Sequence, residues 1–117
     1  MPDMEEETVC FRKTDDGRSI ILPTKKIGKN PIEIRQKLVE QAEQYGYYST
    51  SSSQNSTSLT PLPHMRNLGG GICIMNCHDD TVRIAASSPG KIPSVVPQII
   101  QGAFFNAREC PQGGVSS

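Results

Sequence analysis

The sequence predicts an α+β fold of two ββα halves, in which a four-stranded antiparallel sheet carries two helices packed on one face. Three observations support this prediction: two pairs of alternating apolar segments, a helical pattern after each pair, and an internal repeat. The chain has 117 residues, of which 35% are hydrophobic and none is Trp. That length holds one aliphatic core. We therefore expect a single domain over residues 8–110, between an acidic tail at 1–7 and a disordered Gly/Ser-rich tail at 111–117.

The first half of the domain, residues 8–48, opens with a predicted β-hairpin. The apolar residues Val9 and Phe11, and then Ile20 and Leu22, recur at a spacing of two, as they do in strands with one buried face. The segment Thr14-Asp15-Asp16-Gly17 lies between them. Asp favours the start of a turn, and Gly17 supplies the positive φ that closes a type I turn into a bulge.

A helix is predicted over residues 31–45, with capping signals at both ends. Asn30 can cap its N-terminus, and Pro31 suits the first helical position. Gly46 can take the left-handed conformation that ends a helix. The positions that share one face at helical spacing are Ile34, Leu38, Ala42 and Tyr45.

The segment between the halves, residues 49–71, is predicted to be a flexible insert. Residues 49–58 contain only Ser, Thr, Gln and Asn. Without apolar side chains to bury, such a segment cannot offset the entropy lost on ordering.

The second half, residues 72–110, repeats the pattern of the first. Two alternating segments, 72–74 and 82–84, flank the turn residues 78–80, and a helix is expected from about Ser94, with Pro97 in its first turn. The segment Gly28-Lys29-Asn30-Pro31 recurs as Gly90-Lys91-Ile92-Pro93, an offset of 62 residues, and the flanking apolar positions match at the same offset. Either a duplication or two ordinary hairpin-to-helix connections would produce this pattern.

The four cysteines and two histidines indicate no metal site, cofactor or catalytic centre. The N-terminus lacks a signal-peptide pattern and no segment is long enough to cross a membrane, so we expect an intracellular protein with free thiols. Cys73 and Cys77 on one strand would lie about 13 Å apart, too far to share a zinc ion. Cys77 and His78 would point to opposite faces, which makes them a poor catalytic dyad. We therefore expect no enzymatic activity.

Charge is balanced in sum, with twelve basic and twelve acidic side chains, but is segregated along the chain. Residues 12–37 hold eight Lys or Arg against three acids. If the hairpin brings Arg12 near Lys25 and Lys26, these residues form a positive edge for phosphate contacts. No aromatic residues interleave them, so nucleic-acid binding would be weakly specific.

The leading functional hypothesis is a non-enzymatic regulatory domain that binds a protein partner, with weakly specific nucleic-acid binding as the alternative. Tyrosines near the helix end offer interface anchors. The candidate partner-binding residues are Arg12, Lys13, Arg18, Lys25, Lys26, Lys29, Tyr47 and Tyr48.

Overall fold

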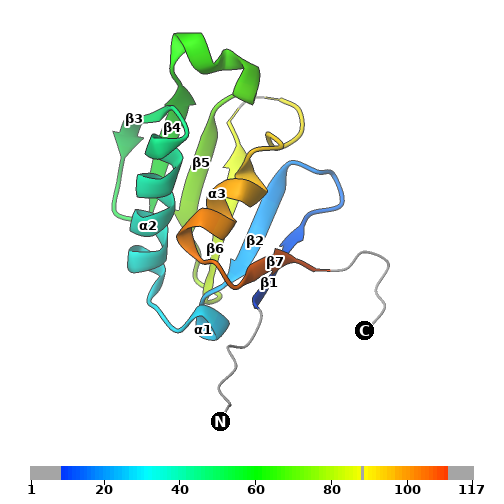
Figure 1. Cartoon of the computed structure of the whole chain (residues 1–117). Coiled ribbons are helices and arrows are strands. Elements are labelled where there is room, and N and C mark those ends of the chain that lie inside the picture. Colours follow the sequence, from blue (N-terminus) through cyan, green and yellow to red (C-terminus); the bar gives the residue numbers. More distant parts are fainter. Residues whose placement is uncertain (1–8, 88, 111–117) are drawn as a thin grey trace.

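The computed structural model describes residues 9–87 and 89–110, and over these ranges the chain has the α+β fold predicted from the sequence (Figure 1). Its elements in chain order are β1 (Val9–Lys13), β2 (Ser19–Pro23), α1 (Thr24–Ile27), α2 (Pro31–Gln44), β3 (Tyr47–Ser52), β4 (Ser56–Pro61), the 3-10 helix η1 (Pro63–Leu68), β5 (Ile72–Asn76), β6 (Thr81–Ala86), α3 (Val96–Ala103) and β7 (Ala107–Glu109). The two predicted tails, 1–7 and 111–117, lie outside the described residues.

The strands form one seven-stranded sheet in the order β3-β4-β5-β6-β2-β1-β7. Neighbouring strands are antiparallel except β1 and β7, which are parallel. The prediction of a four-stranded sheet is therefore wrong in strand number. The four predicted strands are the neighbours β5, β6, β2 and β1, and the sheet is extended by β3 and β4 on one side and by β7 on the other.

The extra strands β3 and β4 come largely from residues 49–71, which we expected to be a flexible insert. Along β4, alternate residues are buried, but only Leu59 among them is aliphatic, since Thr57 and Pro61 fill the other inward positions. In β3 only Tyr47 is buried. A search for alternating apolar residues misses such strands, although Thr and other β-branched residues fit a pleated sheet well.

Local signals at the predicted turn and helix ends act as expected. Gly17 closes the β1–β2 turn at a φ of 72°. Asn30 caps α2 by accepting a hydrogen bond from the backbone N–H of Glu33 (2.9 Å), with Pro31 as the first helical residue. Gly46, at a φ of 104°, follows the end of α2, and the chain reverses there into β3.

The two strands related by the sequence repeat, β2 and β6, are antiparallel neighbours in the middle of the sheet. Their register pairs Ile20 with Ile84 and Leu22 with Val82. Because the repeat relates Ile20 to Val82 and Leu22 to Ile84, exchanging the two strands leaves this pairing unchanged. The register is thus symmetric about the β2–β6 pair.

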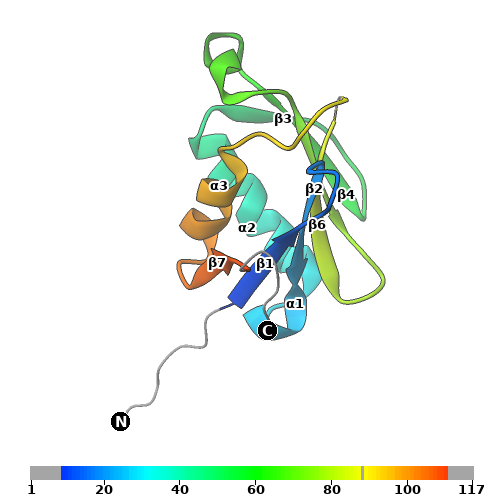
Figure 2. The ribbon, with the colours of Figure 1, turned by 90° about the vertical axis from the view of Figure 1, so that its right-hand side faces the viewer.

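Figure 2 shows α2 and α3 together on one side of the sheet. One cluster of buried apolar residues joins both helices to the strands, with Ile34, Leu38 and Ala42 from α2 and Val96, Ile99 and Ile100 from α3. The helix predicted from Ser94 begins at Val96, and Pro97 lies in its first turn. The inward residues of all four predicted strands contribute to the same core.

Candidate functional site

A pocket of about 510 Å³ lies between α2 and the β3–β4 hairpin. We call it the Arg35 pocket, and its lining residues are Arg35, Gln36, Val39, Glu40, Ser49, Ser52, Ser53 and Thr57. The helix contributes the charged groups and the only aliphatic side chain among the lining residues, and the hairpin contributes four hydroxyl side chains. A volume of this size is typical of a site for a small ligand or for one or two side chains of a partner.

The position of the pocket follows from the chain reversal after α2. Gly46 ends the helix, and β3 then returns beside it before the chain turns again at Ser53–Asn55 into β4. Arg35 and Val39 are one helical turn apart, so they share the side of α2 that this hairpin faces. The hairpin therefore covers a side chain that an isolated α2 would expose.

Arg35 is the central group of the pocket, and it is 8% exposed. Its two terminal nitrogens donate to backbone carbonyls at the tip of the hairpin, Nη1 to Ser53 (3.2 Å) and Nη2 to Gln54 (3.0 Å). Its Nε atom is buried and has no hydrogen-bond partner. A buried donor without a partner is costly, because it loses its hydrogen bond to water and gains nothing in return.

The charge of Arg35 is not neutralised within the described residues. Lys25 forms an ion pair with Asp80 (3.9 Å), and both of these side chains lie at the exposed surface, away from Arg35 in the sequence. The carbonyls that Arg35 contacts are neutral acceptors. A buried cation normally has an anionic partner, and none of the described acidic side chains forms an ion pair with Arg35.

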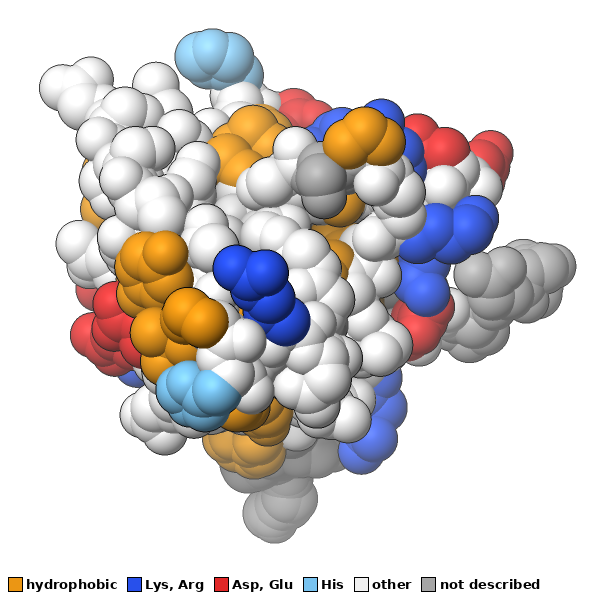
Figure 3. Space-filling model, turned by 90° about the horizontal axis from the view of Figure 1, so that it is seen from above, with side chains coloured by type: hydrophobic (Ala, Val, Ile, Leu, Met, Phe, Trp, Pro, Cys, Tyr) orange, Lys and Arg blue, Asp and Glu red, His pale blue; other side chains and the backbone are white. Residues whose placement is uncertain are grey.

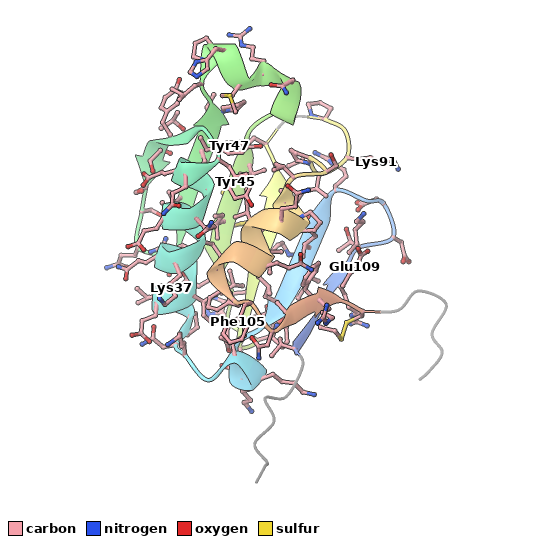
Figure 4. The ribbon with its side chains drawn as sticks, viewed as in Figure 1. Lys37, Tyr45, Tyr47, Lys91, Phe105 and Glu109 are labelled. Carbon is pink, nitrogen blue, oxygen red and sulfur yellow. A yellow bond between two sulfur atoms is a disulfide. The ribbon has the colours of Figure 1, made fainter. Side chains whose placement is uncertain are left out.

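The predicted basic residues do not gather into one positive edge. Lys13 and Arg18 lie at the β1–β2 turn, where Arg18 Nε donates to the carbonyl of Gly90 (3.2 Å) beside Lys91 (Figure 4). Arg12 pairs with Ile21, so the start of α1 lies roughly 10 Å further along the strand at ~3.3 Å per residue.

The other candidates, Lys25, Lys26 and Lys29, lie in and just after α1, at the opposite end of the hairpin. All three are exposed. Figure 3 shows the other end of the molecule, seen from above, where basic and acidic side chains alternate along the right-hand edge.

The two candidate tyrosines have different positions. Tyr47 is 2% exposed, and its hydroxyl donates to the carbonyl of Gly70 (3.5 Å). Burial raises the pKa of the Tyr47 hydroxyl. Tyr47 is therefore a core residue and cannot serve as an interface anchor, whereas Tyr48, the next residue in β3, is exposed. In Figure 4 Tyr45 and Tyr47 lie together at the C-terminal end of α2.

The cysteines differ from the expectation of four free thiols. Cys10 of β1 and Cys110, which follows β7, form a disulfide between residues 100 positions apart. The parallel pairing of β1 with β7 brings them together. Cys73 and Cys77 are free and partly exposed. Over residues 9–87 and 89–110, no group of three or more His, Cys, Asp or Glu side chains is arranged to hold a metal ion.

In the sequence, Arg35 belongs to the basic segment 12–37 but is not one of the predicted partner-binding residues. The available signal for the burial of Arg35 was the apolar residue Val39 one helical turn further on. An apolar residue at this spacing indicates that a second side of the helix is covered by another element. That signal could be used only with knowledge that a hairpin packs there.

The fold and the pocket together define a small α+β domain with a polar pocket at one edge of a mixed sheet. No family model, curated protein or solved structure matches the chain. None of the helices in the described part of the chain is long and apolar enough to cross a membrane.

Proposed function

We propose that this chain is a non-enzymatic binding domain that recognises a protein partner along β3 and in the Arg35 pocket. The observation that carries the proposal is the location of the pocket between a helix and an edge strand. β3 is the first strand in the sheet order, so its outer edge has no partner strand among the described residues. Extended peptides add to such edges, where the backbone supplies affinity and adjacent pockets supply specificity.

The pocket and the free edge suit each other in size and chemistry. β3 spans six residues, enough to pair with a short extended segment. Its bulge between Ser49 and Ser51 twists the strand locally, which discourages unlimited sheet extension and favours one defined partner. Ser49 and Ser52 belong to both the edge strand and the pocket lining, so a paired segment would lie directly beside Arg35.

The composition of the pocket supports binding rather than nucleophilic catalysis. Its serine hydroxyls have no His among the lining residues to accept a proton. His64 and His78 are exposed and lie in other parts of the fold, in η1 and in the β5–β6 turn.

Nucleic-acid binding, the alternative hypothesis, gains no support from the arrangement of the basic residues. They lie at two ends of the β1–β2 hairpin, and one of them, Lys25, pairs with Asp80. A phosphate backbone is bound best by a continuous row of cations.

The proposal is tested by capture of partners from lysate of the source cells, with and without nuclease, by wild-type protein and two matched variants. Ser49→Arg places a large side chain in the pocket, whereas Ser51→Arg makes the same change at an exposed serine of the same strand that does not line the pocket. We expect nuclease-resistant capture that Ser49→Arg reduces at least about tenfold, the effect of ~1.4 kcal/mol, while Ser51→Arg retains it. Capture that is lost with nuclease, or that both variants affect equally, contradicts the proposal.

A further inference from the structure

We infer that the Arg35 pocket receives a carboxylate group of the bound partner. The inference rests on the proposed function, because it assigns a ligand chemistry to the same pocket. The carboxylate belongs either to an Asp or Glu side chain or to the end of a chain, and both present the same planar pair of oxygens.

The hydrogen-bond inventory of Arg35 supports this assignment. A guanidinium carries five N–H donors in a plane, and it matches the two oxygens of a carboxylate. In this structure Nη1 and Nη2 of Arg35 donate to carbonyls, and its buried Nε donor has no hydrogen-bond partner among the described residues. The side chain is more than nine-tenths buried and lines the pocket. A carboxylate bound there would supply both a charge-assisted acceptor and the missing negative charge.

The surroundings of Arg35 favour a single negative charge. Glu40, at the exposed rim, is the only acidic residue among the lining residues, and Arg35 is the only basic one. A monoanion entering the pocket therefore meets one cation nearby and one anion at the rim. A phosphate dianion would be only half neutralised by the same cation, and its remaining negative charge would cost desolvation free energy in this partly buried site. The hydroxyls of Ser49, Ser52 and Ser53 add neutral donors that suit either oxyanion.

The pocket is also larger than a carboxylate alone. Its volume of about 510 Å³ holds an acidic side chain together with part of the backbone that carries it. A segment paired with β3 would supply that backbone, which connects the carboxylate site to the edge-strand interaction.

Arg35 also holds the tip of the β3–β4 hairpin through Ser53 and Gln54, so a purely structural role must give a different experimental result. We suggest NMR titration of the uniformly 15N-labelled full-length protein at constant ionic strength. The probes are N-acetylglutamic acid α-amide for a side-chain carboxylate, N-acetylglycine for a chain-end carboxylate, and inorganic phosphate. The readout is the Arg35 Nε–H resonance together with the amides of Ser53 and Gln54.

We expect a saturable shift of the Arg35 Nε–H resonance with at least one carboxylate probe, with a Kd on the order of 1–10 mM, as for a single charged contact. The probe with the lower Kd identifies the source of the carboxylate, and phosphate should bind more weakly than that probe. Glu40→Gln, at an exposed position, should tighten carboxylate binding roughly 2- to 5-fold by removing one repulsion.

Two further variants complete the test. Arg35→Gln should abolish the saturable shifts of the Ser53 and Gln54 amides, and Lys37→Gln, which removes an exposed charge of the same helix outside the pocket (Figure 4), should leave all the saturable shifts unchanged. Shifts that rise linearly without saturation, or a Glu40→Gln variant that binds no more tightly than wild type, would overturn the inference and leave Arg35 with its hairpin role. Tighter binding of phosphate would overturn the carboxylate assignment. None of these results depends on the capture experiment with Ser49→Arg, so the two proposals fail separately.

Discussion

At the scale of single residues, two positions on α2 show what burial requires of different side chains. Leu38 is fully buried, and Arg35 is 8% exposed. Burial of Leu38 needs only close packing, and it stabilises the fold by removing apolar surface from water. Burial of Arg35 needs acceptors for its donors and an opposing charge, and the fold supplies only the two carbonyls. Leu38 is therefore a stabilising residue, whereas Arg35 is a buried cation with one donor that has no hydrogen-bond partner among the described residues.

The packing role of Leu38 leads to a quantitative prediction. We expect Leu38→Ala to lower the free energy of unfolding by about 2–5 kcal/mol, because it removes buried methyl groups and leaves a cavity. Urea denaturation followed by circular dichroism measures the change. The control is Lys37→Ala at the neighbouring exposed position, which should stay within roughly 0.5 kcal/mol of wild type. A Leu38→Ala variant as stable as the control would show that this face of α2 is not core.

At the scale of elements, the β3–β4 hairpin makes the largest difference between expectation and structure. β4 forms a ladder with β5 on one side and with β3 on the other. Leu59 is 1% exposed and packs in the main cluster. The hairpin is thus part of the folded domain, and it also provides the serine-rich wall of the Arg35 pocket.

Because the β3–β4 hairpin is part of the sheet and the core, we expect that the domain does not tolerate removal of this hairpin. A flexible insert could be shortened at little cost, since closure entropy depends weakly on loop length. We expect instead that deletion of residues 50–66 abolishes cooperative urea unfolding, because it exposes the edge of β5 and removes Leu59 from the core.

A milder pair of substitutions checks the same point without a deletion. Leu59→Ala should cost about 2–5 kcal/mol, and Ser58→Ala, at the adjacent half-buried position of β4, should cost much less. Retained cooperativity after the deletion, together with an unaltered Leu59→Ala variant, would restore the flexible-insert interpretation.

At the scale of the whole molecule, the two ends of the described chain meet at one edge of the sheet. β7 pairs in parallel with β1, and the backbone N–H of Cys110 donates to the carbonyl of Phe11 (2.8 Å). The disulfide between Cys10 and Cys110 covalently closes this edge. A three-residue strand such as β7 makes few ladder hydrogen bonds, so the link restricts its separation from β1.

The disulfide is expected to contribute measurably to global stability. Linking residues 100 positions apart restricts the unfolded chain strongly, so the double variant Cys10→Ser/Cys110→Ser should lose about 2–5 kcal/mol in urea denaturation under non-reducing conditions. The matched control is Cys73→Ser/Cys77→Ser, which alters the two free thiols and should have a smaller effect. Mass spectrometry after alkylation gives an independent check, in which four alkylated cysteines without prior reduction would contradict the disulfide.

The features that could be predicted from the sequence are those set by neighbouring residues. The turn at Gly17, the cap at Asn30 and the end of α2 at Gly46 depend on a few adjacent side chains and on allowed backbone angles. The four central strands and two main helices were likewise visible, because burial of one face imposes a period on the residues themselves. The α+β class follows from these local patterns.

The candidate site was not visible in this way, because each of its parts depends on residues far apart in the chain. Burial of Arg35 requires the β3–β4 hairpin beside α2, and the disulfide requires β1 and β7 to be neighbours. Strand order is set by long-range pairing, in which polar strands such as β3 and β4 gain stability from a ladder whose other members supply the apolar surface. Local sequence therefore sets the four predicted strands and the two main helices, whereas packing between segments that are not adjacent in sequence creates the strands β3 and β4, the free edge and the pocket.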